Sequence, residues 1–346
     1  MYKCTRYCYH EGVKTVFFEC EEWEKKYLVQ HLAGQNVQFL PKPLSGETVA
    51  YATDAEAISV FIYSTLTREV LEKLPQLKSI STRSTGYDHI DLAYCKERGI
   101  LVCNVPEYGT HSVAEHTFAL ILALSRHIVE SVDKTRRGNF DLRGLMGFDL
   151  YGKTIGVVGV GSIGRSVIQI AKGFGMRVVA TTENPSEIEA KAHGITLLDL
   201  KELLSVSDII TLHVPLTKKT RHMINSKNIR RCKKGSLLIN TARGGVVETE
   251  AIVKGLEEKI LAGVGLDVLE EECFVKEERQ LLSGRFLAEC DLKTQLLNHV
   301  LLTQENVIVT PHNAFHSREA LTKILDVTVG NILGVASGNR QNIVEA

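Results

Sequence analysis

The chain has 346 residues, 44% of them hydrophobic, and its 41 basic and 41 acidic residues balance to a formal net charge of zero. This length suits about two domains with substantial cores. A balanced charge gives no overall field that would attract nucleic acid or an anionic membrane, so we expect neither as a partner. The sequence has no apolar run near the roughly 18 residues of a membrane span, and its N-terminus lacks the apolar stretch of a secretory signal.

Eight cysteines are spread along the chain without a C-x-x-C pair. In a chain of this length they are typical of reduced thiols, so we expect a cytoplasmic protein. Cys4, Cys8 and His10 lie close together near the N-terminus. No fourth ligand accompanies them and their spacing matches no common zinc site, so no metal is predicted.

Short β-rich segments alternate with helical ones from the start of the chain. The first third contains segments rich in Val, Ile and Phe at 14–19, 36–40, 57–62, 77–83 and 100–105. Their spacing leaves room for a crossover helix after each strand, which predicts a parallel sheet.

Residues 111–130 interrupt this rhythm with a helical segment that is apolar on nearly all sides in its second half. Such a helix is expected to be buried on several sides, inside a domain or between domains or subunits. Ser112 and Glu115 predict a capping box at its start. His111 and His116 are interpreted as structural rather than catalytic.

A second series of strands follows, which predicts a doubly wound, Rossmann-type sheet. Its segments are 153–158, 177–181, 208–214, 236–240, 262–268 and 306–310. A last helix is expected from Ser317 to about Ala336.

The first strand of this series runs into the stretch VVGVGSIG, which has the G-x-G-x-x-G pattern at Gly159, Gly161 and Gly164. The pattern alone is weak, but here a strand precedes it and an amphipathic helix follows. Glycines at these places allow a tight turn, a close approach of the backbone to a pyrophosphate, and close packing of helix on strand. The N-terminus of the helix favours phosphate, and Arg165 adds a positive charge, so we predict a dinucleotide site.

Loops of this kind are usually followed, about 20 residues on, by an acid that binds the adenosine ribose. This chain has Thr182 there, with Glu183 next. Loss of the acid removes repulsion against the 2′-phosphate of NADP, but Glu183 would repel that phosphate and could reach a ribose hydroxyl. We therefore predict NAD rather than NADP, bound less tightly than with the usual acid.

Three side chains that suit redox chemistry on a hydroxy acid follow three strands of this series: Arg243, Glu272 and His312. Ligands of doubly wound sheets bind beyond the carboxyl ends of the strands. A guanidinium can hold a carboxylate in a forked pair, and an imidazole exchanges protons near neutral pH. Each residue alone also suits a turn or a solvated loop, but their matching positions favour a shared site.

These stretches together resemble the D-isomer-specific 2-hydroxyacid dehydrogenases, most of all the fermentative D-lactate dehydrogenases. The resemblance covers about residues 77–335 and rests on STRSTGYDHIDL, NVPEYGTHSVAEHTFALILALSR, GNFDLRGLMGFDLYGKTIGVVGVGSIGR, LHVPLTKKTRHMIN, INTARGGVVE, LDVLEEE and VIVTPHNAF. It implies an α/β fold of two doubly wound parallel-sheet domains. A Rossmann-type NAD-binding domain (108–311) would be inserted into a flavodoxin-like substrate domain (1–107 and 312–346), with the active site between them. It also implies a homodimer.

The resemblance further implies roles for individual residues. Arg243 would bind the substrate carboxylate and carbonyl, His312 would be the acid/base, and Glu272 its partner. Those implied to contact the substrate elsewhere are Ser84, Thr85 and Gly86, through backbone N–H groups, and Tyr108 and Phe315, around its side chain. Those implied to contact NAD are Gly159, Gly161, Ser162, Ile163, Gly164, Arg165, Thr182, Glu183, His213, Pro215, Thr241, Ala242 and Asp267. Asp267 equally suits a buried acid with a structural role.

Two departures from the lactate-type pattern leave the substrate open. Residues 273–305 match poorly, and suit an amphipathic helix, a contact surface or a solvated segment. His316 stands where an aromatic residue is common. Pyruvate is the favoured 2-oxo acid, with glyoxylate, hydroxypyruvate or a bulkier 2-oxo acid as alternatives. A corepressor-like protein that senses NAD without catalysis, or a methyl-donor-binding Rossmann protein, are further alternatives.

Overall fold

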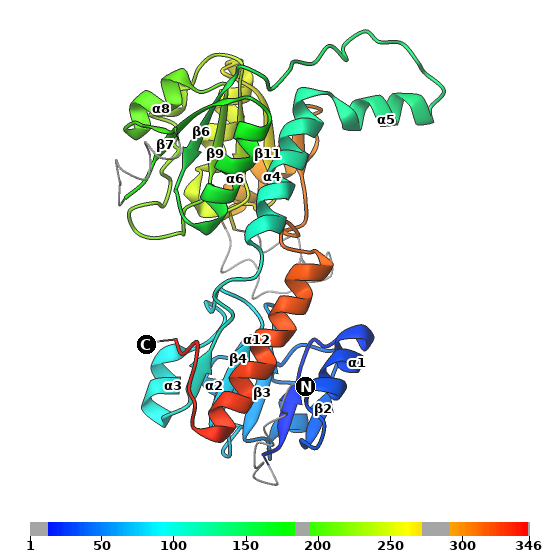
Figure 1. Ribbon diagram of the computed structural model, residues 1–346, viewed down its shortest axis with the longest axis vertical. Coiled ribbons are helices and arrows are strands. Elements are labelled where there is room, and N and C mark those ends of the chain that lie inside the picture. Colours follow the sequence, from blue (N-terminus) through cyan, green and yellow to red (C-terminus); the bar gives the residue numbers. More distant parts are fainter. Residues whose placement is uncertain (1–12, 184–193, 272–290, 345–346) are drawn as a thin grey trace, which may run out of the picture. The chain divides into compact units, whose positions relative to one another are not determined.

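The computed structural model describes residues 13–183, 194–271 and 291–344 (Figure 1). The chain forms two compact units: Met1–Tyr108 with Ser317–Ala346, and Gly109–His316. The chain therefore crosses between units after residues 108 and 316, where the sequence predicted crossings after 107 and 311. Glu272 and the N-terminal Cys4, Cys8 and His10 lie outside the described residues.

The first unit is built on a parallel sheet. In the described residues its strands are β1 (Thr15–Phe17), β2 (Val37–Phe39), β3 (Ala57–Val60), β4 (Ser79–Thr82) and β5 (Leu101–Cys103). Their order is β2-β1-β3-β4-β5, and every pair is parallel. This is the flavodoxin-like order, so the predicted fold of this unit is confirmed. The helices are α1 (Glu22–His31), α2 (Arg68–Leu71), α3 (Leu92–Arg98) and α12 (Arg318–Ser337), with a short 3-10 helix η1 (Val49–Ala52).

The long helix α12 brings the C-terminal part of the chain back to this unit (Figure 1). It begins where predicted, because the Ser317 hydroxyl accepts a hydrogen bond from the Ala320 N–H and so caps the helix. Leu325 and Ile332 pack in one cluster with apolar side chains of β1 and α1. Among the described helices, α12 alone is long and apolar enough to cross a membrane by length and composition, and part of its surface packs in this cluster.

The second unit carries a larger parallel sheet. In the described residues its strands are β6 (Thr154–Val158), β7 (Arg177–Thr181), β8 (Thr196–Leu197), β9 (Ile209–Leu212), β10 (Ser236–Asn240), β11 (Leu261–Leu266) and β12 (Val307–Val309). Their order is β12-β11-β10-β9-β6-β7-β8. Counted from β6, this is the Rossmann order with one more strand at the β12 side, so the predicted Rossmann-type sheet is confirmed. The short strand β8 was not predicted. The direction of winding reverses between β6 and β9, where such sheets bind their ligands.

Helices flank this second sheet. They are α4 (Thr110–Ser125), α5 (Ile128–Arg136), α6 (Ser162–Gly173), α8 (Leu200–Val206), α9 (Thr249–Glu257) and α11 (Leu292–Leu302), with 3-10 helices η2 (Ile229–Arg231) and η3 (Gly244–Val246).

The expected helix at 111–130 is two helices. The first, α4, begins at Thr110 with Gly109 in the capping position, so the predicted capping box of Ser112 and Glu115 is wrong. It ends at Ser125, and the chain turns at His127, whose φ of 49° lies in the left-handed region. Burial on several sides is confirmed, because α4 packs against α6 and against β10, β11 and β12.

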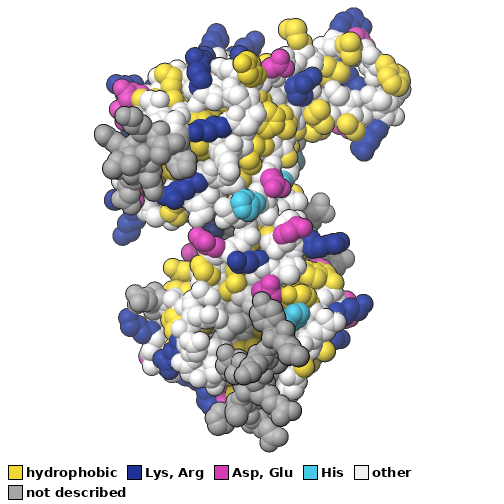
Figure 2. Space-filling model, viewed as in Figure 1, with side chains coloured by type: hydrophobic (Ala, Val, Ile, Leu, Met, Phe, Trp, Pro, Cys, Tyr) yellow, Lys and Arg dark blue, Asp and Glu magenta, His cyan; other side chains and the backbone are white. Residues whose placement is uncertain are grey.

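The second helix, α5, and the loop after it extend away from the sheet of the second unit (Figure 1). None of its described residues is buried. Figure 2 shows hydrophobic side chains on this extension. The most exposed of them are Phe140, Leu142, Met146 and Tyr151, at 77, 80, 91 and 82% exposure. We call residues 128–151 the arm.

Candidate active site

The glycine loop joins β6 to α6 at the point where the winding of the sheet reverses. Gly159 has φ 95°, and a Cβ there would lie 2.5 Å from the His213 carbonyl oxygen. A Cβ at Gly164 would lie 2.1 Å from the carbonyl oxygen of Gly159, so only glycine allows the helix to start this close to the turn. A Cβ at Gly161 would meet no atom within 4 Å, which leaves open space above the first turn of α6. This cradle fits the pyrophosphate of a dinucleotide, since the N–H groups of a first helical turn have no partner within the helix.

The end of β7 carries the two residues predicted to meet the adenosine ribose. Thr182 is half-buried and Glu183 is exposed. Lys219, from the loop after β9, donates a hydrogen bond to Glu183, with Nζ 2.6 Å from Oε1. The lysine lowers the pKa of the Glu183 carboxyl, and the carboxylate raises the pKa of Lys219, so the pair is charged at neutral pH. The sequence interpretation placed no cation here.

His213 follows β9 and lies directly beside the glycine loop. Its N–H donates to the Val158 carbonyl oxygen at 2.7 Å, and its Nε2 lies 2.9 Å from the Thr211 hydroxyl. Burial lowers the pKa of His213 to about 3, so the imidazole is neutral at physiological pH. Pro215, two residues further on, is exposed.

Arg243 lies on a tight turn after β10. The Asn240 side chain holds this turn, because its amide donates to the Arg243 carbonyl oxygen at 3.0 Å and accepts from the Ala242 N–H at 3.1 Å. The Thr241 hydroxyl lies 3.0 Å from that of Thr117 on α4. The Arg243 side chain is exposed, and within the described ranges no carboxylate is ion-paired with it. Its guanidinium can therefore take an anion from outside the chain.

Gly244, the next residue, allows the arginine turn to lie against the end of β11. A Cβ there would lie 1.9 Å from the Leu269 carbonyl oxygen. Glu270, buried at 8% exposure, connects the elements around this contact. It is hydrogen-bonded to His222 Nε2 and accepts from the N–H and hydroxyl of Thr249 at 3.0 Å each.

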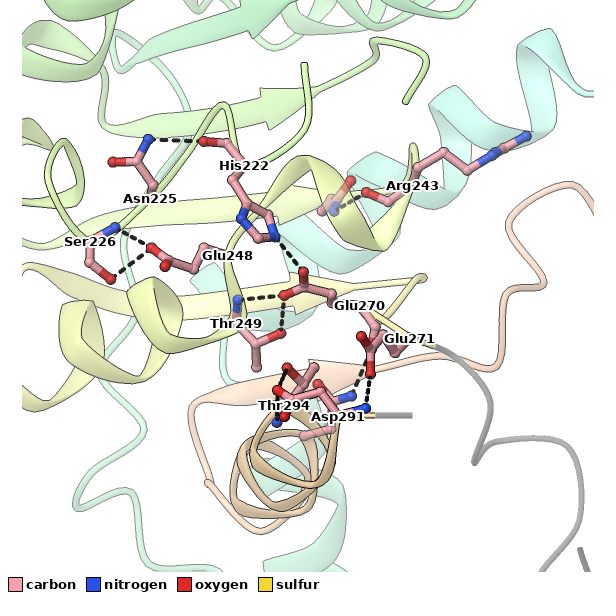
Figure 3. Close-up of polar contacts among 12 residues, drawn as sticks. His222, Asn225, Ser226, Arg243, Glu248, Thr249, Glu270, Glu271, Asp291 and Thr294 are labelled. Carbon is pink, nitrogen blue, oxygen red and sulfur yellow. Dashed lines mark hydrogen bonds and ion pairs between the residues drawn. The ribbon is translucent and has the colours of Figure 1, made fainter. Parts of the chain in front are cut away.

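Figure 3 shows Glu270 between His222 and Thr249, with the Arg243 side chain pointing away from them. The His222 N–H donates in turn to the Gly245 carbonyl oxygen at 2.9 Å. Glu270 thus stabilises the turn that carries Arg243, and its carboxylate is engaged by His222 and Thr249. Of the described acids in the run Glu270–Glu272, Glu270 is the buried one.

Asp267 fixes the loop that carries His312. The carboxylate is 1% exposed and accepts from the Thr310 hydroxyl at 2.6 Å and from the N–H groups of Asn313 and Ala314 at 2.9 Å each. These contacts match the structural alternative for Asp267. His312 itself has φ 52°, a left-handed conformation uncommon outside glycine, so the loop holds its backbone in a strained position.

The histidines of α4 belong to this scaffold. His116 Nε2 lies 3.0 Å from the Thr310 hydroxyl and 3.6 Å from the Asp267 carboxylate. His111 Nδ1 lies 3.3 Å from the Ser166 hydroxyl on α6. Both therefore hold elements together, in agreement with their structural interpretation.

The sheet order brings the predicted catalytic residues to one edge. Arg243 and His312 follow β10 and β12, which flank β11. The carboxyl ends of parallel strands meet at the same edge, which is also the edge of the glycine loop. The structure thus places Arg243, His312 and the nucleotide cradle on one side of the second unit.

The predicted carboxylate loop belongs to the first unit. Ser84 donates from its hydroxyl to the Gly86 carbonyl oxygen at 2.6 Å, and Thr85 donates to the Val105 carbonyl oxygen at 2.8 Å. Arg83, 1% exposed, anchors the start of this loop by donating to the carbonyl oxygens of Phe18 and Glu19 at 2.8 and 2.7 Å. Sequence reasoning missed Arg83, because nothing in the sequence marks a charged side chain in that loop as buried.

The predicted side-chain pocket residues fall in different units. Tyr108 ends the first stretch of the first unit, whereas Phe315 belongs to the second. Phe315 packs beside Gly109, where a Cβ would lie 3.2 Å from its own Cβ. The ring of His316 lies 6.0 Å from that of Phe315 in an edge-on arrangement, so a polar ring stands beside the predicted pocket residue.

The segment 273–305 is described only from residue 291. There Asp291 caps the start of α11, because its carboxylate accepts from the N–H groups of Lys293 and Thr294. The Asn298 amide donates to the Glu270 carbonyl oxygen at 2.9 Å, so α11 supports the same cluster as His222. A helix was one of the expected forms of this segment.

Comparison with known proteins gives a consistent result. Residues 118–314 match the family model described as D-isomer specific 2-hydroxyacid dehydrogenase, NAD binding domain. D-lactate dehydrogenase kk1H of Curvularia clavata is 38% identical over 336 residues, covering 94% of this chain and 93% of the relative. Glyoxylate reductase of Pyrococcus furiosus is 35% identical over 318 residues, covering 89% and 84%. The crystal structure of D-lactate dehydrogenase from Aquifex aeolicus, complexed with NAD and lactic acid, is 37% identical with a TM-score of 0.80, covering 94% and 96%.

Proposed function

The chain belongs to the D-isomer-specific 2-hydroxyacid dehydrogenases, a family of NAD-dependent oxidoreductases, and we propose that it reduces pyruvate or another small 2-oxo acid to the D-2-hydroxy acid. The observation that supports this most is the placement of Arg243 and His312. They follow β10 and β12 on the edge that carries the glycine cradle.

In the proposed reaction, bound NADH supplies the hydride that reduces C2 of the 2-oxo acid. Arg243 would hold the substrate carboxylate and polarise the ketone, since its guanidinium is exposed and unpaired with any carboxylate of the described chain. His312 would donate a proton to the carbonyl oxygen as charge develops there. Glu272 would orient the imidazole and favour its protonated form.

The surrounding residues of the second unit support these roles. Asp267 holds the loop of His312 through three hydrogen bonds, and Glu270 holds the turn of Arg243 through Thr249 and His222. Rigid support of this kind keeps a reacting group within reach of its substrate. We propose the first unit as the substrate-binding domain and the second as the NAD-binding domain. The residues that we propose to contact the substrate there and beside Arg243 are, as the resemblance implied, Ser84, Thr85, Gly86, Tyr108 and Phe315.

Glyoxylate and hydroxypyruvate are the second candidate substrates. The relative from Pyrococcus furiosus is named a glyoxylate reductase. His316 beside Phe315 also adds a polar group where an apolar wall would favour a methyl substituent. We favour pyruvate because the Curvularia relative and the Aquifex structure are both named D-lactate dehydrogenases.

The test is a set of initial rates of NADH oxidation with pyruvate, glyoxylate, hydroxypyruvate, 2-oxobutyrate and 2-oxoisocaproate. The highest kcat/KM is expected for pyruvate, with a product that only a D-specific reagent enzyme reoxidises. A higher kcat/KM for glyoxylate or hydroxypyruvate would select the second candidate. No turnover with any of these acids, or an L-product, would contradict the proposed function.

We also propose that the protein is a homodimer joined through the arm, residues 128–151. A nine-residue helix without buried residues is not stable on its own in water. Its apolar neighbours Phe140, Leu142 and Met146 are more than three-quarters exposed. A second copy of the chain would cover them, since exposed apolar patches on soluble proteins mark interaction sites.

A cytoplasmic location remains our proposal. Cys20, Cys95, Cys103 and Cys232 are free and buried in the described chain, which suits a reducing compartment. Fractionation of cells that express the tagged full chain tests this proposal, and recovery of the protein with membranes or in the medium would contradict it.

A further inference from the structure

The ion pair between Glu183 and Lys219 stands where a Rossmann site chooses between NAD and NADP. The two cofactors differ only by a phosphate on the 2′-oxygen of the adenosine ribose. That ribose lies beyond the second strand of the unit, which is β7 in this chain. β7 ends at Thr181, whose carbonyl oxygen accepts from the N–H of Gly159 at 2.8 Å, so the strand end adjoins the glycine cradle.

The two residues reach this place from different loops. Glu183 is the second residue after β7, whereas Lys219 comes from the loop after β9, 36 residues further along the chain. Their atoms Oε1 and Nζ are 2.6 Å apart, although 72% and 82% of the respective side-chain surfaces are exposed. An exposed ion pair of this kind adds little to the free energy of unfolding. What matters here is that a carboxylate and an ammonium group stand at this position.

The backbone that presents Lys219 is held in a hydrogen-bonded turn. The Thr217 N–H donates to the Thr220 hydroxyl at 2.8 Å, and that hydroxyl donates to the Pro215 carbonyl oxygen at 2.5 Å. The Arg221 N–H also donates to the Thr217 carbonyl oxygen at 2.9 Å. The ammonium group is therefore presented at the ribose position by a fixed turn rather than by a free loop.

We propose that Glu183 selects NAD over NADP by occupying the ammonium group of Lys219, which is by position a ready-made binding group for a 2′-phosphate. The carboxylate repels the phosphate and at the same time holds the cation that would neutralise it. With NAD no phosphate is present, and the free oxygen of the carboxylate can accept from a ribose hydroxyl. This inference extends the NAD-binding role and rests on the proposed function only for the position of the ribose, not for the substrate.

Two single substitutions are expected to change the preference between NADH and NADPH in opposite directions. Glu183→Gln releases Lys219, so the ratio of Kd for NADPH to Kd for NADH is expected to fall about tenfold, as for one charge-assisted hydrogen bond gained. Lys219→Gln leaves Glu183 unneutralised, so the same ratio is expected to rise by about threefold or more. The double variant has neither charge and is expected to lie between the two.

The measurement is a titration of each variant with NADH and NADPH, followed by the fluorescence of the reduced nicotinamide, without substrate. The gain in the Glu183→Gln variant is expected to shrink at high salt, because an exposed charge is screened. Glu258→Gln is the matched control. Glu258 also forms an exposed ion pair, with Arg230, but it lies just before the start of β11, whereas Glu183 lies after the end of β7. The Glu258→Gln variant is expected to have the same ratio of Kd for NADPH to Kd for NADH as the wild type.

Three results would overturn the proposal. They are a ratio in Glu183→Gln within twofold of the wild type, shifts of both single variants in the same direction, and a shift of equal size in Glu258→Gln. Because binding is measured without substrate, failure to reduce pyruvate would contradict the proposed function and leave this test intact. Absence of binding of both cofactors to the wild type would contradict the placement of the ribose.

Discussion

The proposed reaction depends on His312, because we propose this residue as the group that donates the proton to the substrate. Removing a general acid typically lowers the rate by 10²–10⁴-fold. We expect His312→Gln to lower kcat with pyruvate by that factor and to leave the Kd for NADH unchanged.

The matched control for this variant is His31→Gln, on the exposed face of α1 in the first unit. It is expected to keep the kcat of the wild type. A kcat for His312→Gln within about threefold of the wild type would show that another group carries the proton.

His213 makes the stability of the second unit depend on pH. Burial lowers its pKa in the folded protein to about 3, whereas an unfolded chain binds the proton near pH 6.5. Its contribution is therefore fully present above pH 6.5 and is lost as the pH falls toward 3. The loss is at most about 1.4 kcal/mol for each pH unit.

Urea unfolding between about pH 4 and 7.5 measures this effect. The His213→Gln variant has no proton to gain and is expected to lose less stability than the wild type as the pH falls below 6.5. Parallel stability curves for the two proteins would show that His213 is not the titrating group.

Single residues also show how far sequence can lead. The three glycines of the loop could be predicted because each meets a local steric need that the motif records. Lys219 could not, since it lies 36 residues from Glu183 and only the folded loops bring the two together. Glu270 and Arg83 were missed for a related reason, because burial of a charged side chain depends on partners far away in the sequence.

At the scale of secondary structure, Asp208 ties together the starts of strands in the second sheet. Its carboxylate accepts from the Thr154 N–H at 2.8 Å and from Lys233 Nζ at 2.7 Å. Burial acts to raise the pKa of this carboxyl, but the two hydrogen bonds together with the positive charges of Lys233 and Lys153 outweigh burial and hold the pKa below its usual range.

We expect Asp208→Asn to lower the free energy of unfolding by about 1.5–3 kcal/mol at neutral pH. The lowered pKa means that this contribution is present above the unfolded value near 4 and is lost as the pH falls through the folded value. The difference in urea midpoint from the wild type should thus narrow in acid. Asp54→Asn, which breaks an exposed pair with Lys14, is the control and is expected to leave the urea midpoint close to that of the wild type.

The arm permits a direct test of the proposed homodimer. The double variant Leu142→Asp with Met146→Asp places two charges on side chains that are 80 and 91% exposed, so the fold of the protomer should tolerate them. We expect light scattering after gel filtration to give the mass of a dimer for the wild type and of a monomer for this variant.

A charge elsewhere on an exposed apolar side chain is the control for that experiment. Tyr51→Asp, at 55% exposure on η1 of the first unit, is expected to remain dimeric. A wild-type monomer, or a dimer that survives both charges on the arm, would show that the arm is not the contact.

Among the elements, the β-rich segments were predictable because buried parallel strands are short runs of Val, Ile and Leu. Several strands were predicted to extend one or two residues too far at an end, because residues that are still buried no longer form the hydrogen bonds of the sheet. The two-residue β8 gave no such signal. The break after α4 depends on the left-handed conformation of His127, which a non-glycine residue does not announce.

For the whole molecule, the order of strands in both sheets agrees with the fold that the resemblance implied. Repeated βα units predict parallel sheets, but not which strand neighbours which, and only the family resemblance supplied that order. The exact crossing between units is also a property of packing, because residues 312–316 are held by Asp267 and Gly109 of the second unit.

The interrupted first unit predicts an asymmetric response to truncation. A chain that stops after His316 lacks α12, whose Leu325 and Ile332 pack with Phe17 and Leu28. We expect trypsin to degrade the first unit of this shortened chain rapidly and to leave a resistant fragment of the second unit that still binds NADH. Equal resistance of both units would contradict this expectation.

The same connectivity has a consequence for synthesis on the ribosome. The second unit is one continuous stretch, so it can fold as soon as residue 316 has left the exit tunnel. The first unit, by contrast, lacks α12 until residues 318–337 have been made. The apolar side chains around Phe17 and Leu28 therefore stay uncovered while more than 200 further residues are synthesised. We expect a chaperone to bind the nascent chain at this surface.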